Sequence, residues 1–451
     1  MHPSAAVSRG ITLAVVVIAA LVALLSARPF AGSWNDGSRL ATVECLVDYG
    51  TWVIDQSIFV QPPPASTAAP LPYPAGDTLL LSRGTQDKLF IDGHYYSDKS
   101  PVPALYLAAI YRVLQGTTGL VARTEPARFC YLLTLFSSGL AYVISVFCID
   151  RLAQSLGTMT RLLVTASFAF ATIALPYARQ VNNHILILAV CCVLLSFLNP
   201  KTRGQLIAAG LLLGAAYTID LGIGPVLVLS FIGLVAYRTR SVGKVTLVLL
   251  AAFPLFFLHH YFNWRIGGTF GPANAQPAFF LWPGAPFDAS NLTGGWAHKS
   301  IGHFVAYALD LLFGKRGLLG HNLALFLTLP GVVVLLRSRV KETPEIIWAV
   351  SFFVGGWLVY AITSNNYSGL SCSIRWFVPL LAPGYYLLVV LLRYVSRYRA
   401  ELVILTLFGL VEGALMWWKG PWMPHMVPGF WFIQGGALLA WLLYRFSPRK
   451  S

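Results

Sequence analysis

Two sets of polar residues stand out in this apolar chain and could do chemistry at a membrane surface. The first is the stretch QDKLFIDGHYYSDKSP (86–101), where lysines, aspartates, a histidine and tyrosines lie side by side before apolar sequence resumes. The second is Arg375, which precedes Trp376 at the start of an apolar segment. Charges at membrane depth are costly and tend to be functional. A guanidinium at the end of a membrane-spanning helix can bind a lipid-linked phosphate. An arginine with no such role can also extend to the lipid headgroups from this position.

The composition indicates that these residues belong to a polytopic membrane protein. Hydrophobic residues make up 57% of the 451 residues, charged residues make up 11%, and the mean hydropathy is +0.67. The net charge of +15 would suggest nucleic-acid binding in a soluble protein, but lysine and arginine also collect in the cytoplasmic loops of membrane proteins. We therefore expect a lipid bilayer as a partner and no nucleic acid. The sequence contains no phosphate-binding loop, zincin motif or serine-hydrolase motif.

About twelve apolar segments are long enough to cross a membrane as helices. They lie at approximately 11–27, 129–149, 161–177, 184–198, 205–219, 221–236, 245–262, 318–336, 345–362, 376–392, 401–417 and 428–444. An even number of spans places both termini on one side, and every second loop is then short and basic, from Arg151 and Arg161 to the tail at 445–450. The positive-inside rule predicts that these loops are cytoplasmic. The long loops 28–128 and 263–317 are then external, and periplasmic in a cell with an outer membrane.

Three segments are expected to meet the membrane in other ways. The apolar stretch 101–120 is predicted to be a helix on the external face, because counting it as a span would place the basic loops outside. Residues 37–49 are predicted to form a short amphipathic helix in the interface. The first apolar segment is expected to be a retained anchor, because SARPFAG is a poor signal-peptide cleavage site. Together the segments predict a single all-α transmembrane domain over residues 1–451.

Several short motifs resemble those of the GT-C glycosyltransferases, the polyprenyl-phosphate-sugar-dependent enzymes that include protein O-mannosyltransferases and the lipid A aminoarabinose transferase. Asp36 and Arg39 are similar to the acid and the arginine of the family's opening external helix. DK at 87–88 and GHYYSDKSP at 93–101 are similar to its Gly-x-Tyr-Tyr-Ser-x-Lys-Pro-Pro type of sequence. The resemblance covers most of the chain. It implies an all-α polytopic membrane protein of GT-C-like fold, with about 12 transmembrane helices and external interfacial helices.

The resemblance implies a membrane glycosyltransferase that moves a sugar from a polyprenyl-phosphate donor to a glycan, lipid or protein acceptor on the external face, with inversion of configuration. Such a reaction needs positive charge at the leaving phosphate and a carboxylate that takes a proton from the acceptor. Asp36 is the expected base. The expected ligands of the donor phosphate and sugar are Arg39, Lys88, His94, Tyr95, Tyr96, Lys99 and Arg375. The expected location is a cell membrane, with a bacterial inner membrane favoured.

The sequence departs from the family's pattern at three places. Gly37 stands where many members have a second acid, NNH at 182–184 stands where they have an aspartate, and Ser100 replaces the first proline after the lysine. These departures leave the cofactor unassigned and a divalent metal open, with His184 as its candidate ligand. They also leave open a GT-C-like protein that binds the sugar and has lost catalysis.

Two further alternatives follow from the residues themselves. A transporter or flippase for a lipid-linked sugar would also need polar residues at a lipid-accessible cavity, but it is expected to have repeated halves, broken helices and charges near the bilayer midplane. Asp36 also suits a structural role, because an aspartate just before a helix can cap its N-terminus. The sequence does not predict the sugar, the acceptor or the polyprenol length.

Overall fold

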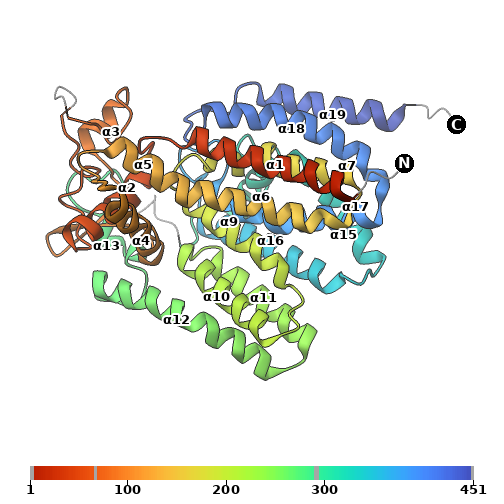
Figure 1. The fold of residues 1–451 in the computed structure, drawn as a ribbon, viewed down its shortest axis with the longest axis horizontal. Coiled ribbons are helices and arrows are strands. Elements are labelled where there is room, and N and C mark those ends of the chain that lie inside the picture. Colours follow the sequence, from red (N-terminus) through yellow and green to blue (C-terminus); the bar gives the residue numbers. More distant parts are fainter. Residues whose placement is uncertain (1–4, 65–68, 289–293, 448–451) are drawn as a thin grey trace.

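The computed structural model describes residues 5–64, 69–288 and 294–447, and Figure 1 presents them as a bundle of long helices with smaller elements gathered at its left-hand end. The helices of the bundle are α1 (Ala5–Ser26), α5 (Pro126–Thr134), α6 (Leu140–Leu152), α7 (Thr158–Phe170), α9 (Asn183–Leu194), α10 (Arg203–Ile219), α11 (Gly224–Thr239), α12 (Val242–Gly267), α15 (Thr328–Arg337), α16 (Thr343–Thr363), α17 (Leu381–Tyr394), α18 (Arg399–Lys419) and α19 (Phe430–Phe446). The smaller elements are α2 (Trp34–Glu44), α3 (Thr78–Arg83), β1 (Lys88–Ile91), β2 (His94–Ser97), α4 (Pro101–Thr118) and α13 (Pro277–Phe280). Further helices are α8 (Ala174–Tyr177), α14 (Ile301–Phe313) and η8 (Arg375–Leu380).

The helices of the bundle arise from the apolar segments of the sequence. Each segment predicted to span the membrane contains a helix, and the prediction of an all-α polytopic membrane protein is confirmed. Helices long and apolar enough to cross a membrane are found at Pro126–Ser155, Val242–Gly267, Thr343–Thr363, Arg375–Tyr394 and Ser396–Lys419. Helix α4 is not among them, and neither are α1, α10 and α19, so the location of 101–120 outside the membrane stays a prediction. The number of spans, about twelve, stays a prediction.

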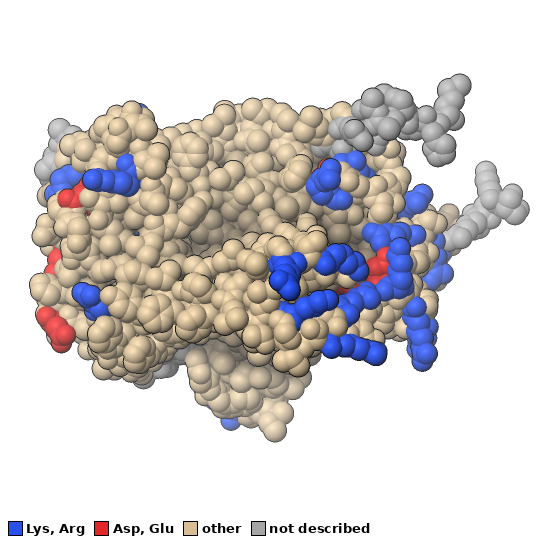
Figure 2. Space-filling view, turned by 60° about the horizontal axis from the view of Figure 1, so that its bottom comes forward, with Lys and Arg blue, Asp and Glu red and all other residues tan. Residues whose placement is uncertain are grey.

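Charged side chains are concentrated at the two ends of the molecule. Helix α1 begins and α19 ends at the right-hand end of Figure 1, as an even number of spans requires. Figure 2 shows that lysines and arginines crowd this same end, whereas the middle of the visible face carries few charges. The basic tail residues Arg449 and Lys450 lie outside the described residues. An apolar band between two charged ends is the surface expected of a protein that crosses a bilayer.

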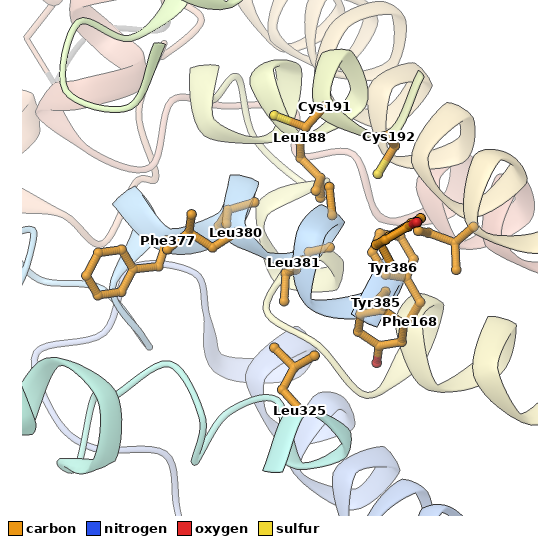
Figure 3. Packing of buried hydrophobic residues seen from close by; sticks show 14 of the residues in the cluster. Phe168, Leu188, Cys191, Cys192, Leu325, Phe377, Leu380, Leu381, Tyr385 and Tyr386 are labelled. Carbon is orange, nitrogen blue, oxygen red and sulfur yellow. The ribbon is translucent and has the colours of Figure 1, made fainter. Parts of the chain in front are cut away.

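The core of the bundle surrounds α17, in which twelve of the fourteen residues are buried. Figure 3 shows side chains from several elements gathered around it: Phe168 of α7 lies beside Tyr385 of α17, and Leu188 of α9 and Leu325 lie on opposite sides of α17. Closely packed interiors resist small displacements. The packing of α17 therefore anchors η8, which directly precedes it and begins with Arg375.

The smaller elements build the end of the molecule that holds the 28–128 loop. Strands β1 and β2 pair antiparallel with Lys88 opposite Ser97, and α4 begins at Pro101 as predicted. The helix expected at 37–49 begins three residues earlier, at Trp34, and nearly all of α2 is buried. Its apolar residues share a core cluster with the segment at 54–60, and its polar face is covered by protein as well. Side chains of α2 are therefore held more rigidly than those of a helix on an open surface.

Candidate functional site

A narrow hollow of about 20 Å³ lies where α2, β2, α4 and the ends of α9, α10 and α12 meet. Arg39, Lys99 and Asn183 line its polar side. Leu107 of α4 and Ile266 of α12 line its apolar side. Cations that face an apolar wall suit an amphipathic anion.

A second hollow, of about 370 Å³ and partly open to solvent, adjoins the first. Trp52, Tyr96 and Ile266 line both hollows and separate them. Phe262 of α12 packs against Trp52 with the ring centres 5.1 Å apart, and Arg265 lies on the same side. Aromatic rings with polar groups at their edges can stack on a sugar ring and bond its hydroxyls.

Lys99 lies between β2 and α4, and its ammonium contacts two carboxylates. Its Nζ lies 2.7 Å from Oδ2 of Asp87 and 2.7 Å from Oδ2 of Asp98. Burial raises the pKa of Asp87, but the charges of Lys99, Arg375 and Arg39 outweigh burial and hold this pKa below its ordinary value. Burial raises the pKa of Asp98 above its ordinary value, and Lys99 offsets this rise in part. The three side chains form a compact charged cluster at the edge of the hollow.

Arg39 extends from α2 into the same region. Its Nη1 donates to the backbone oxygen of Asn35 at 2.7 Å, and its Nη2 donates to Oδ1 of Asn183 at 2.6 Å. Burial lowers the pKa of Arg39 to about 10, so the guanidinium is still positively charged at neutral pH. Asn183 also donates from Nδ2 to the backbone oxygen of Ile219, at 3.1 Å. One asparagine therefore joins α2, α9 and α10 behind the arginine.

Arg375 approaches the charged cluster from the side of the bundle. Its Nε is buried and has no hydrogen-bond partner among the described residues. Its guanidinium carbon lies 5.5 Å from the ring centre of Trp422. Its charge, after the larger effect of burial, helps to lower the pKa of Arg39, so the two cations lie near each other. A buried N–H of a cation without a protein partner is costly, and an anionic ligand would satisfy it.

Asp36 lies in the first turn of α2, and its side chain is 1% exposed. Its Oδ2 accepts a hydrogen bond from the N–H of Gly32 at 2.7 Å, and its Oδ1 accepts one from the hydroxyl of Ser33. The expectation that Asp36 caps the helix is wrong, because Ser33 is the N-cap and accepts from the N–H groups of Asn35 and Asp36. Burial raises the pKa of the Asp36 carboxyl, although the Ser33 hydrogen bond lowers it in part. The carboxylate lies behind the lining of the hollows rather than in it.

The structure separates Lys88, His94 and Tyr95 from the residues that line the hollows. The Nζ of Lys88 lies 4.1 Å from the ring centre of Tyr95, and Nδ1 of His94 lies 2.8 Å from Oδ2 of Asp55. Tyr96, in contrast, lines both hollows. Neighbouring side chains of a strand point to opposite faces, so the side chains of Tyr95 and Tyr96 lie on opposite faces of β2.

His184 lies at the start of α9 and contacts the residue that ends α10. Its Nδ1 lies 3.1 Å from Oδ2 of Asp220. Within the ranges that the structure describes, no group of three or more His, Cys, Asp or Glu side chains could hold a metal ion. The residues around His184 therefore do not fit the three or four protein ligands that are usual for a divalent metal such as zinc.

The structure adds residues that the sequence motifs did not assign to the site. Asp87 and Asp98 both form ion pairs with Lys99. Both lie in the polar stretch at 86–101, which could have indicated that they belong to the site. Asn183 stands in the unusual NNH sequence and holds Arg39 in place. Trp52 comes from an irregular segment and reaches the hollow by tertiary packing, so no local pattern marks it.

Comparison with known proteins identifies structures of similar fold. No family model and no curated protein matches the sequence. The structure of ArnT from Cupriavidus metallidurans bound to undecaprenyl phosphate matches with a TM-score of 0.52 and 14% identity, over 98% of this chain and 73% of that chain. The apo form of the same ArnT matches with a TM-score of 0.53 and 16% identity, over 96% and 76% of the two chains. A weaker similarity, with a TM-score of 0.47 and 12% identity over 97% and 58%, is to the apo oligosaccharyltransferase of Archaeoglobus fulgidus.

An identity of 14–16% to ArnT establishes a shared fold and leaves the reaction to be argued from the site. ArnT is a GT-C glycosyltransferase. The match to ArnT covers 98% of this chain. The chain therefore has the fold of the GT-C glycosyltransferases, as the sequence resemblance predicted.

Proposed function

We propose that this chain is an integral-membrane glycosyltransferase that moves a sugar from a polyprenyl-phosphate donor to an acceptor on the external face of the membrane. The observation that carries the proposal is the hollow in which Arg39 and Lys99 face the apolar wall of α4 and α12. A polyprenyl-phosphate-sugar complements this hollow. Its anionic phosphate would meet the cations, and its apolar chain would meet the apolar wall. The GT-C fold and the undecaprenyl phosphate bound to ArnT support this choice of donor.

In this proposal the donor phosphate lies among Lys99, Arg39 and Arg375, and the polyprenyl chain leaves along the wall of α4 and α12. As the bond between the anomeric carbon and the phosphate oxygen breaks, negative charge grows on the leaving phosphate. Cations already in place stabilise that charge without having to reorganise. Trp52 and Tyr96 stand between the two hollows, so the sugar would meet their rings.

The acceptor enters through the wider hollow and attacks the anomeric carbon from the face opposite to the phosphate, which inverts its configuration. Asp36 is the proposed proton acceptor for the attacking group. A raised pKa makes its carboxylate a stronger base than an exposed aspartate. To act, Asp36 must exchange its hydrogen bond with Ser33 or Gly32 for one with the acceptor.

The external location is proposed from the distribution of charge. The end of the bundle opposite to the hollow carries the crowd of lysines and arginines seen in Figure 2. Short loops rich in these residues face the cytoplasm in membrane proteins. The hollow would then open at the outer surface of a cell membrane. We propose that this membrane is a bacterial inner membrane.

The test supplies the purified full chain, in lipid nanodiscs, with polyprenyl-phosphate-linked sugars and measures the release of polyprenyl phosphate. Charge-assisted hydrogen bonds to phosphate contribute about 1.5–3 kcal/mol, so Lys99→Ala is expected to weaken donor binding by about tenfold or more. Arg112→Ala is the control, because Arg112 is exposed on α4 and bonds to Gln115. Unchanged donor affinity in both Lys99→Ala and Arg375→Ala would remove the phosphate site.

A GT-C-like protein that binds the lipid-linked sugar without catalysis is the second candidate. The hydrogen bonding of Asp36 favours it, because Gly32 and Ser33 already occupy both carboxylate oxygens. Such a protein would bind the donor with the same dependence on Lys99. Donor binding without release of polyprenyl phosphate, across the panel of sugars and with potential acceptors present, would support this candidate over the transferase.

A further inference from the structure

The turn at 219–223, which connects α10 to α11, is linked through its neighbours to both arginines of the proposed phosphate site. Asp220, the second residue of this turn, is 9% exposed and is the C-cap of α10. Oδ1 of Asp220 accepts hydrogen bonds from the N–H of Gly222 at 2.8 Å and the N–H of Ile223 at 3.2 Å. The same oxygen accepts one from the hydroxyl of Tyr360 at 2.9 Å. The carboxylate therefore holds the turn in shape and ties it to α16.

The first connection runs from the turn to Arg375. The ring of Tyr360 stacks on that of Trp376 with the ring centres 4.5 Å apart and the planes 7° apart. Trp376 is the next residue after Arg375 in η8. Gly222 is needed for this arrangement, because a Cβ there would collide with the Tyr360 hydroxyl. The position of Tyr360, set by Asp220, thus fixes the backbone from which Arg375 extends.

The second connection runs from the turn to Arg39. The backbone oxygen of Ile219 accepts from Nδ2 of Asn183 at 3.1 Å, and Oδ1 of Asn183 accepts from Nη2 of Arg39 at 2.6 Å. The neighbouring pair is also in contact, since Nδ1 of His184 lies 3.1 Å from Oδ2 of Asp220. Ile219 and Asp220 of the turn therefore contact Asn183 and His184, which are consecutive residues of α9.

We propose that Asp220 is a positioning residue and that the turn at 219–223 sets the relative placement of Arg39 and Arg375 for one phosphate group. The inference rests on the proposed function, because it explains how the donor-phosphate site is assembled. Asp220 acts through its neighbours and does not contact the donor. Two arginines that come from elements as distant in sequence as α2 and η8 bind a small anion well if a common support holds both.

The test measures the affinity of the full chain in nanodiscs for undecaprenyl phosphate. Tyr360→Phe removes the hydroxyl that bonds Asp220 and keeps the ring that stacks on Trp376. Tyr142→Phe is the matched control, because Tyr142 of α6 is also buried in the bundle and its hydroxyl donates to the backbone oxygen of Ala169 at 2.7 Å. We expect Tyr360→Phe to weaken binding by about 2- to 30-fold, as positioning effects commonly do, and Tyr142→Phe to leave binding unchanged.

A double-mutant cycle separates positioning from a general loss of stability. If Tyr360 acts through Arg375, then Tyr360→Phe causes a smaller loss of affinity in an Arg375→Ala background than in the parental chain. Equal losses in both backgrounds, or parental affinity in Tyr360→Phe, would overturn the positioning role and leave the proposed function standing. Failure of the parental chain to bind undecaprenyl phosphate would overturn the donor site itself, and the positioning role with it.

Discussion

Among single residues, Asp36 has two possible roles that one substitution separates. Asp36→Asn keeps the size of the side chain and an oxygen that can accept from Gly32 or Ser33, but it removes the basic carboxylate. We expect an intact fold, nearly unchanged donor affinity and turnover lowered by about 10²- to 10⁴-fold. Thermal unfolding and single-turnover kinetics measure these quantities. A folded variant that transfers sugar at close to the parental rate would leave Asp36 with its structural role at the Ser33 cap.

Glu44 is expected to make the stability of the end of the molecule that holds α2 depend on pH. Its Oε2 accepts hydrogen bonds from the Ser57 hydroxyl at 2.6 Å and the N–H of Ile58 at 3.1 Å, and the side chain is fully buried. Burial raises the pKa of Glu44 from 4.5 to about 7, so the folded protein binds this proton more tightly than the unfolded chain. The corresponding stability is fully present below the unfolded pKa and is lost as the pH rises through about 7.

Glu44→Gln is expected to remove this dependence, because the amide does not ionise. A pKa rise of this size corresponds to a difference in stability of up to about 3 kcal/mol at pH 8, in favour of the glutamine variant. Unfolding temperatures measured between pH 5 and 8 report the effect. Glu125→Gln is the control, because Glu125 is exposed and pairs with Arg128 on the surface. Identical pH profiles for the parental protein and Glu44→Gln would contradict the prediction.

The sequence motifs named some of the residues that line the hollow, but not all residues of a motif lie there. Arg39, Tyr96 and Lys99, which the motif matches named, line the first hollow, and their binding of the donor stays a prediction. Lys88 and Tyr95 belong to the same motif, but strand geometry directs them to the other face of the hairpin, where they contact each other. The sequence alone does not show which of two neighbouring residues in a strand faces a cavity, because this depends on the pairing register of the strand.

At the scale of elements, the contact between α10 and α12 depends on glycine. A Cβ added to Gly214 of α10 would lie 2.8 Å from the backbone oxygen of Ala252 in α12, too close for the helices to keep their separation. We expect Gly214→Ala to destabilise the protein by about 1–3 kcal/mol, as overpacking does, and to weaken donor binding because α12 supplies Ile266 to the hollow. Gly233→Ala on α11 is the control, since nothing lies within 4 Å of its added Cβ. Equal unfolding temperatures for the two variants would contradict this view of the contact.

The helices of the bundle were predictable because each requires a long apolar segment, and hydropathy reports length and apolarity directly. The hairpin at 88–97 was not predicted, since strands of four residues leave little periodicity to detect. The 263–317 loop also contains α14, an apolar helix that packs along α16, where Trp357 donates to the backbone oxygen of Ala308 at 2.8 Å. A helix of thirteen residues is shorter than a span, so hydropathy does not distinguish it from a loop segment that folds back.

At the scale of the whole molecule, charge and hydropathy together predict the arrangement that the structure has. The end with the crowded lysines and arginines is also the end where α1 begins and α19 ends (Figures 1 and 2). The hollow lies at the other end, among the elements of the 28–128 loop. The sequence could not locate the hollow within that end, because its walls come from five helices and a hairpin that meet by long-range packing.

Orientation in the membrane can be tested with single introduced cysteines. All six native cysteines are free, and each is buried or half-buried, so the background reaction with a membrane-impermeant thiol reagent is expected to be low. Arg240 is exposed between α11 and α12 at the basic end, whereas Arg112 is exposed on α4 beside the hollow. In intact cells or spheroplasts we expect labelling of Arg112→Cys from outside and none of Arg240→Cys until the membrane is permeabilised, because short basic loops stay in the cytoplasm. Labelling of Arg240→Cys from outside would invert the topology and place the proposed phosphate site on the cytoplasmic face.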